Sequence, residues 1–320
     1  MTRTVAVLGA GGIGRHHANW WRLEGASVVA ILGRTDASVA LSAGKLQSLF
    51  GFNGAVYTDL DTLLREADPD IVDICTPAAC HFAQAAAALR NGRQVLCEKP
   101  LVFDHALSTR ELLAQATTLS ELAHAGSLNF GLCSQFAIAA RTCRELLATR
   151  TSAPLRRIGM ELRSPVRGRP PNPAQTWIDL GPHLIAALQT LLPGAEPDWA
   201  SLRTAAAGHD ADFAFTIKPA VGPAVTVQLD VGFTLGEPAN VRRITLNDTA
   251  FDLIGEAGPD GHFRMRYHSS DGIDEPRPDP MRLLIREFLA GTPTLDAAAA
   301  MLNLTLLLRL LEAIPHAAAE

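Results

Sequence analysis

Short apolar runs alternate with amphipathic helical patterns along the first 135 residues. Strand-like runs lie at residues 5–8, 28–32 and 71–75, and apolar positions with helical spacing mark residues 13–23 and 37–50. Strands that are apolar at nearly every position belong to parallel sheets covered by helices on both faces. The same alternation predicts further helices at 60–66, 80–89 and 106–119 and further strands at 95–97 and 128–133.

A different pattern begins near residue 150, where strands follow one another without intervening helices. Residues 225–234 alternate strictly, so Val225 and Leu229 share one face of a strand and Thr226 and Asp230 share the other. We therefore expect a sheet with one buried face and one polar face. Other strands are predicted at 156–163, 241–246, 250–254 and 263–267, with turns at 247–248 and 258–261 and an irregular loop at 165–173.

The two patterns divide the chain into two domains, a number that its length of 320 residues also favours. Residues 1–135 are expected to form an α/β, doubly wound Rossmann domain. Residues 136–320 are expected to form an α+β domain with a mostly antiparallel, open-faced sheet, which carries substrate and oligomer contacts. The apolar stretch 295–314 is interrupted by Asp296 and Arg309, which favours a helix packed back on the first domain over a membrane span.

Composition narrows the classes of function. The chain is 48% hydrophobic and 19% charged, with a formal net charge of -5 and no basic run that would bind nucleic acid. Its five cysteines form no C-x-x-C pair and lack metal-ligand spacing, so we expect no metal site. The first residues pass directly into a strand without signal-peptide features, which predicts a cytoplasmic protein that acts on a small molecule.

The segment Gly9-Ala10-Gly11-Gly12-Ile13-Gly14 follows the first strand and opens the first helix. In that context the G-x-G-x-x-G pattern is typical of a dinucleotide-binding turn. Gly9 permits the tight turn, Gly11 lets the backbone approach a pyrophosphate, and Gly14 lets the helix pack closely on the strand. The phosphates would then meet the unpaired N–H groups of a helix start. The alternative is a structural turn that binds no ligand.

The end of the second strand indicates which dinucleotide is bound. NAD-binding domains usually have an acidic residue here that holds the ribose 2′-hydroxyl, but Gly33 stands at that position. Arg34 and Thr35 follow, and they can bind a 2′-phosphate through a charge-assisted pair and a hydroxyl contact. The residues therefore favour NADP. NAD is the alternative, with Arg34 stacked on the adenine and Asp36 holding the ribose.

Three residues have the chemistry for hydride transfer beside a bound nicotinamide. A carbon that bears a hydroxyl group can lose a hydride only if its oxygen loses a proton, and His183 suits the role of the base. Asp179 precedes it by four residues, on the same face of a helix, where it could hold the imidazole or bind a substrate hydroxyl. Lys99 follows a strand, at the edge where open α/β sheets bind ligands, and could polarise the reacting oxygen.

The motifs around these residues occur as a set, which comprises Thr76-Pro77, His81, Cys97-Glu98-Lys99-Pro100 and Asp179-Leu180-Gly181-Pro182-His183. The set resembles the Gfo/Idh/MocA oxidoreductases, a family named after glucose-fructose oxidoreductase and inositol dehydrogenase. The resemblance implies that Lys99 and His183 are the catalytic pair, with Asp179 beside them. It also implies that Pro100 fixes the lysine backbone, often through a cis peptide bond. We expect the cofactor site to include Gly9, Gly11, Gly12, Ile13, Gly14, Gly33, Arg34, Thr35, Thr76, Pro77, His81, Glu98, Lys99 and Pro100.

Each of these assignments has a structural alternative. Lys99 could form a surface ion pair with Glu98, and His183 could be a core histidine capped by Asp179. His81 could line the cofactor pocket, but at a helix start it could equally be a residue of the helix surface.

Two departures from the family pattern concern the substrate. Residues 171–177 lack the glycines that many sugar-acting members have before the position of Asp179, and no acidic residue follows His183 closely. Fewer contacts to substrate hydroxyls are therefore expected, and Trp177, Trp199 or Phe136 could supply an apolar wall. Gln135 could bind substrate through its amide. These features favour a substrate less polar than a sugar.

The residues together predict an NADP-preferring dehydrogenase or reductase that acts on a secondary alcohol or carbonyl of a sugar, cyclic polyol or related small molecule. One alternative is reduction of an imine or a conjugated bond in the same pocket. Another is a regulatory protein that binds NADP without turnover. The polar face of the 225–234 strand has no predicted helix to cover it, and relatives associate through such sheets, so we expect a homodimer or homotetramer.

Overall fold

The computed structural model describes residues 2–166, 168–259 and 262–315. Its contacts divide the chain into two units. The first unit comprises Met1–Ser134 and Met281–Leu304, and the second comprises Gln135–Pro280 and Thr305–Glu320. Arg167 in the loop expected at 165–173, and Asp260 and Gly261 in the turn expected at 258–261, lie outside the described residues. Within the described ranges, the helices are all too short or too polar to cross a membrane.

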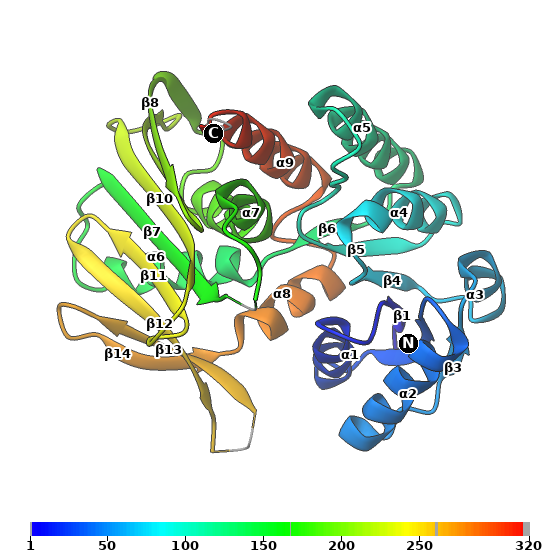
Figure 1. Cartoon of the computed structure of the whole chain (residues 1–320). Helices are drawn as coiled ribbons and strands as arrows, with labels where there is room; N and C mark the ends of the chain where they lie inside the picture. The colour runs from blue at the N-terminus through cyan, green and yellow to red at the C-terminus, as the bar shows by residue number, and fades with distance from the viewer. Residues whose placement is uncertain (1, 167, 260–261, 316–320) are drawn as a thin grey trace. The chain divides into compact units, whose positions relative to one another are not determined.

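A six-stranded parallel sheet forms the centre of the first unit, in the order β3-β2-β1-β4-β5-β6 (Figure 1). The chain begins in the middle of the sheet and builds outward in both directions, so the strand order reverses between β1 and β4. Doubly wound sheets bind their ligands at this switch point. The predicted Rossmann fold is confirmed. The strands are β1 Thr4–Leu8, β2 Ser27–Leu32, β3 Ala55–Tyr57, β4 Ile71–Ile74, β5 Gln94–Glu98 and β6 Phe130–Cys133.

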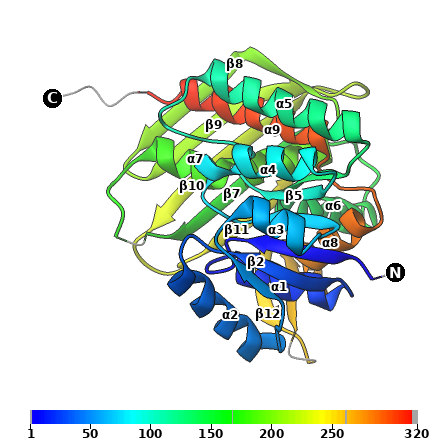
Figure 2. The ribbon, with the colours of Figure 1, turned by 90° about the vertical axis from the view of Figure 1, so that its right-hand side faces the viewer.

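Helices from two parts of the chain pack in this unit. Two of them begin with reciprocal capping boxes, at Thr35 and Ser108. Helices α4 and α5 lie side by side (Figure 1, Figure 2). A later helix packs on the first one, because Phe288 meets the Trp21 ring edge-on with centroids 5.9 Å apart. The helices are α1 Gly14–Leu23, α2 Asp36–Phe50, α3 Leu60–Glu66, the 3-10 turn η1 Ala78–Cys80, α4 His81–Arg90, α5 Thr109–Gly126, α8 Pro280–Leu289 and the beginning of α9 Ala297–Glu312.

The second unit contains an eight-stranded sheet in the order β14-β13-β12-β11-β7-β10-β9-β8. Strands β7 and β10 are parallel, and every other neighbouring pair is antiparallel. The predicted α+β class with a mostly antiparallel sheet is confirmed. The strands are β7 Arg157–Pro165, β8 Glu196–Ala207, β9 Asp210–Lys218, β10 Val225–Thr234, β11 Val241–Leu246, β12 Thr249–Ala257, β13 Phe263–Ser269 and β14 Asp274–Pro278.

Two helices, α6 Gln135–Ala148 and α7 Pro173–Leu191, pack against this sheet (Figure 1). On β10 the predicted alternation holds, because Val225 and Leu229 are buried whereas Thr226 and Gln228 are exposed. The apolar face of the sheet therefore forms a core with α6 and α7. Sequence patterns alone did not predict α6, α8 or the strands β3, β8, β9 and β14.

Candidate active site

The glycine turn has the close contacts that require glycine at two of its positions. Gly9 has φ +87°, and a Cβ there would lie 2.8 Å from the carbonyl oxygen of Cys75. A Cβ at Gly14 would lie 2.5 Å from the carbonyl oxygen of Gly9. By contrast, a Cβ at Gly11 would meet nothing closer than 3.5 Å, and Gly12 faces open space. The turn is therefore packed on its protein side and open on the other.

The start of α1 beside this turn is suited to an anion. Ile13 occupies the N-cap position without a side-chain capping bond, and the first turn of this fully described helix has no acidic residue. Ile13 itself is 46% exposed. The first N–H groups of a helix carry a partial positive charge, so this end can hold the phosphates of a dinucleotide.

Packing at the end of β2 explains why glycine and not an acidic residue stands at position 33. A Cβ at Gly33 would lie 2.7 Å from the Cβ of Val39, because α2 passes close to the strand at this point. Arg34 is exposed, and no hydrogen-bond or ion-pair partner is recorded for it among the described residues. Thr35 caps α2, since its Oγ1 accepts from the backbone N–H of Ser38 at 3.2 Å. The hydroxyl proton of Thr35 is still available to a ligand.

His81 holds the two loops that follow β4 and β5. It is 1% exposed, its Nδ1 lies 2.9 Å from the carbonyl oxygen of Pro100, and its Nε2 lies 2.8 Å from that of Thr76. The alternative of a helix-surface residue is wrong, because both nitrogens face main-chain oxygens inside the protein. The Lys99-Pro100 peptide bond is cis. Lys99 itself is partly exposed at the carboxyl end of β5.

A buried cluster beneath Lys99 was not found from the sequence. The His17 imidazole, which is fully buried, places Nδ1 2.9 Å from Asp73 Oδ2 and Nε2 3.1 Å from Glu98 Oε1. Burial, the largest single cause, lowers the pKa of His17, but the Asp73 carboxylate together with Cys75 and Cys133 raises it, and the net result is a pKa well above its usual value. The imidazole is therefore charged near neutral pH. The available signals were Asp73, a charge inside an apolar strand, and His17 on the buried side of α1.

The same cluster includes donor atoms that a metal ion could use, namely those of His17, Glu98 and Cys133. Burial, the largest cause, raises the pKa of Cys133 to about 12. Without a metal the group is therefore a neutral thiol near neutral pH, and a bound metal would have to displace its proton, because metals bind the thiolate. The distances of 2.9 and 3.1 Å around His17 are those of hydrogen bonds.

In the second unit, α7 carries Asp179 and His183 one turn apart. The Asp179 carboxylate accepts a hydrogen bond from Gln175 Nε2 at 3.1 Å and forms an ion pair with Arg169. The ring of Phe136, at the start of α6, lies 5.0 Å from that of His183. Gln135 is the first residue of α6 and is partly exposed. Lys99 belongs to the first unit, whereas Asp179 and His183 belong to the second. The predicted catalytic residues are therefore divided between the two units.

Trp177 does not form an apolar wall for substrate. It is 0% exposed, its Nε1–H donates to the carbonyl oxygen of Leu307 at 3.0 Å, and its ring packs on Phe213 with centroids 4.3 Å apart. The prediction was wrong because the indole belongs to the core beneath α7. Trp199 lies on β8, where its ring stacks on Phe215.

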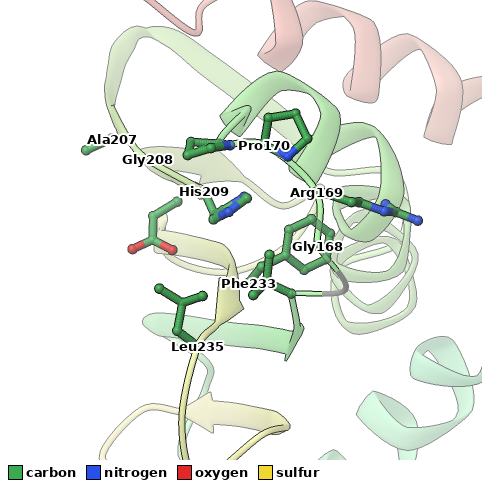
Figure 3. Close-up of a pocket in the computed structure, with 11 residues that line it drawn as sticks. Gly168, Arg169, Pro170, Ala207, Gly208, His209, Phe233 and Leu235 are labelled. Atoms are coloured by element: carbon green, nitrogen blue, oxygen red, sulfur yellow. The ribbon is translucent and has the colours of Figure 1, made fainter.

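A pocket of about 710 Å³ lies in the second unit beside Arg169. Figure 3 shows Pro170, His209 and Phe233 around it. The Arg169 guanidinium carbon lies 5.6 Å from the centre of the Phe233 ring, and the His209 ring meets the same ring edge-on at 5.5 Å. Arg169 thus joins this pocket to the Asp179 carboxylate.

The sheet order, the glycine turn and the open helix start together define the first unit as a dinucleotide-binding Rossmann domain. Residues 3–127 match the family model GFO_IDH_MocA, described as an oxidoreductase family with an NAD-binding Rossmann fold. Over these residues the chain is similar to the Gfo/Idh/MocA oxidoreductases, which supports the resemblance seen in the motifs of the first unit.

Most of the curated relatives match over about a third of their length. Inositol 2-dehydrogenase/D-chiro-inositol 3-dehydrogenase of Shouchella clausii (strain KSM-K16) is 36% identical over 103 residues, which cover 32% of this chain and 29% of that protein. Two solved structures match over nearly the whole chain and show the fold. UDP-N-acetylglucosamine 3-dehydrogenase GnnA from Acidithiobacillus ferrooxidans has a TM-score of 0.72 and 21% identity, with 98% of each chain covered. An inositol dehydrogenase homolog from Azotobacter vinelandii, complexed with NADH and myo-inositol, has a TM-score of 0.71 and 17% identity, with 98% of this chain and 95% of that chain covered.

Proposed function

We propose that this protein is an NADP-preferring dehydrogenase or reductase that transfers a hydride between nicotinamide and the CH–OH carbon of a sugar, a cyclic polyol or a related small molecule. The observation that carries the proposal is the combination of an intact glycine turn with Lys99 at the end of β5 and with Asp179 and His183 on one helix. Relatives named inositol 2-dehydrogenase and D-glucoside 3-dehydrogenase support this class of reaction. The cytoplasmic location expected from the sequence belongs to the same proposal.

The residues of the first unit fit a bound dinucleotide. Gly9 and Gly14 keep the protein side of the turn compact, and the uncapped start of α1 would hold the pyrophosphate. Arg34 and the hydroxyl of Thr35 would hold a 2′-phosphate. The bound nicotinamide supplies the group that accepts or donates the hydride.

The protein's own residues would move the proton and stabilise charge at the reacting oxygen. In the direction of oxidation, His183 would take the proton of the substrate hydroxyl, and in reduction it would return that proton. The Lys99 ammonium would stabilise the negative charge that develops on the reacting oxygen. Asp179, held by Gln175 and Arg169, places a carboxylate on the same helix one turn before His183.

Turnover by defined variants tests this assignment. The purified protein would be mixed with NADP or NADPH and a panel of polyols, sugars, ketones and imines, with nicotinamide fluorescence as the signal. We expect turnover of a polyol or sugar, and a loss of about 100-fold or more in kcat/KM in Lys99→Ala and in His183→Ala. Lys45→Ala, on the exposed surface of α2, is the matched control and should keep wild-type turnover. Full turnover in both catalytic variants would contradict the mechanism, and binding without turnover across the panel would favour a regulatory protein.

The preference for NADP depends on Arg34. We expect NADPH to bind more tightly than NADH, and we expect Arg34→Ala to weaken NADPH binding by about tenfold or more, because hydrogen bonds between charged groups are strong. NADH binding should change little, which makes it the internal control. Tighter binding of NADH by the wild-type protein would overturn the preference.

We also propose a homodimer or homotetramer that forms through the second sheet. Thr226 and Gln228 are exposed on the face of β10 opposite the buried valines, and Asp230 is partly exposed beside them. Light scattering at micromolar concentration should give the mass of two or four chains. A monomer would refute this part of the proposal.

A further inference from the structure

A chain of buried hydrogen bonds connects the phosphate-binding helix to the main chain of Lys99. His17 lies in the first turn of α1, and its Nε2 is 3.1 Å from Glu98 Oε1. The other oxygen of that carboxylate, Oε2, accepts from the backbone N–H of Lys99 at 3.2 Å. On the far side of the imidazole, Asp73 accepts from His17 and, at 2.6 Å, from Trp21 Nε1.

Charge makes this arrangement specific. Only a protonated imidazole has two N–H donors, so the charged form of His17 is the one that can donate to Asp73 and Glu98 at the same time when both are ionised. The Asp73 side chain is fully buried and that of Glu98 is 13% exposed. Removing one member of such a group leaves a buried charge unpaired, which is strongly unfavourable. The carboxylate of Glu98 is therefore held in one position.

The segment that contains Lys99 is held at a second point. His81 Nδ1 lies 2.9 Å from the carbonyl oxygen of Pro100, one residue beyond Lys99. Glu98 thus holds the main chain on the amino side of the Lys99 Cα, and His81 holds it on the carboxyl side. Both contacts involve main-chain atoms of the segment around Lys99.

We propose that His17 and Glu98 are positioning residues that fix the main chain at Lys99, and hence the direction of its ammonium, relative to the phosphate-binding turn. The proposal rests on the proposed function only in taking Lys99 as the catalytic group. It predicts that loss of either residue affects the chemical step more than the binding of the dinucleotide.

The chain has only three lysines, Lys45, Lys99 and Lys218, which allows a test without a known substrate. Reductive methylation with ¹³C-formaldehyde would give NMR signals for each dimethylated lysine, and assignment by single Lys→Arg variants would identify them. We expect Glu98→Ala and His17→Gln to shift or broaden the Lys99 signal and to leave those of Lys45 and Lys218 unchanged, because both of these are exposed.

Two further variants separate positioning from a loss of stability. Glu98→Gln keeps the shape of the side chain, but its amide offers one acceptor where two donors must be met, so we expect an intermediate change. Trp21→Phe removes a buried donor to Asp73 and leaves the His17–Glu98–Lys99 contacts in place. This control should lower the melting temperature without moving the Lys99 signal.

Kinetics completes the test, with the substrate found in the panel and with NADPH as the binding probe. We expect Glu98→Ala to lower kcat by about tenfold or more, as misplaced catalytic groups do, and to change the Kd of NADPH by a smaller factor. Glu98→Gln should recover part of the kcat. An unchanged Lys99 signal and kcat in folded Glu98→Ala and Glu98→Gln would overturn the proposal. Full turnover by Lys99→Ala would instead refute the proposed function, whereas the NMR result would still report on positioning.

Discussion

Gly14 and Gly33 are both fixed by a neighbour that leaves no space for a side chain. An added Cβ would lie 2.5 Å from the carbonyl oxygen of Gly9 in the first case and 2.7 Å from the Cβ of Val39 in the second. The second contact has a consequence for the cofactor, because α2 fills the space that an acidic residue would need at the end of β2. The close packing of α2 on the strand is therefore the physical reason why position 33 holds glycine and not an acidic residue.

Gly14→Ala should damage the turn that binds phosphate. The new methyl group would collide with main-chain atoms that cannot move aside cheaply, so we expect a loss of about 1–3 kcal/mol in the free energy of unfolding. We also expect weaker binding of NADPH in a fluorescence titration. Gly44→Ala, inside α2 with open space around it, is the control and should raise stability by about 0.5–1 kcal/mol. Unchanged NADPH binding in Gly14→Ala would contradict the assigned role of the turn.

The stabilising contribution of His17 is expected to be lost at alkaline pH. Its pKa is raised in the folded state, so its stabilising contribution is complete below the unfolded value of about 6.5 and is lost as pH rises through the higher folded value. We expect the difference in free energy of unfolding between the wild type and His17→Gln to shrink at alkaline pH. Urea denaturation at a series of pH values measures it. A difference that grows with pH would show that His17 is neutral in the folded protein.

At the scale of elements, the polar face of the second sheet carries an unfavourable carboxylate pair. Asp230 on β10 is opposite Asp212 on β9. Burial and then the neighbouring Asp212 raise the pKa of Asp230 to about 6, although a hydrogen bond from Gln228 opposes the shift. Because the folded pKa is above the unfolded value of 3.8, the favourable contribution is complete below that value and is lost as pH rises through about 6.

Asp230→Asn should therefore stabilise the protein above about pH 6. We expect a gain of about 1 kcal/mol at about pH 8, after allowance for solvent screening at this partly exposed site, and no gain near about pH 4. Asp252→Asn is the matched control on β12, because it removes a partner of Arg243 at 2.7 Å and should give no stabilisation. Thermal unfolding at the two pH values measures both effects. Lower stability of Asp230→Asn at the higher pH would contradict the repulsion.

The elements that sequence patterns predicted well have a clear period or a local cap. Strands β10 and β11 and helix α3 occur at the predicted bounds. Helix α6 was missed although Arg141, Arg144 and Glu145 lie at helical spacing among its buried residues. Strand β8 was missed because a break in register between Asp198 and Arg203 interrupts its alternation. Helix α8 is short and follows a strand region directly.

At the scale of the whole molecule, local motifs were readable and long-range contacts were not. The glycine turn and the Glu98-Lys99-Pro100 segment each lie in a few consecutive residues. The partners of His17, Asp73 and Glu98, are 56 and 81 residues away in sequence, so only the fold brings them together. Trp177 was misassigned because it lies two positions before Asp179 on the same helix. Side chains two positions apart on a helix point in directions that differ by about 200°, so Trp177 faces the core when Asp179 faces outward.

The central claim is that hydride transfer to or from NADP depends on Lys99 and His183, and one measurement tests it most directly. The rate of nicotinamide oxidation or reduction would be compared among the wild type, Lys99→Ala and His183→Ala with the panel substrate, at saturating dinucleotide. We predict that the wild type turns over, and that each variant loses about 100-fold or more in rate when the dinucleotide is saturating. Wild-type rates in both variants would contradict the account.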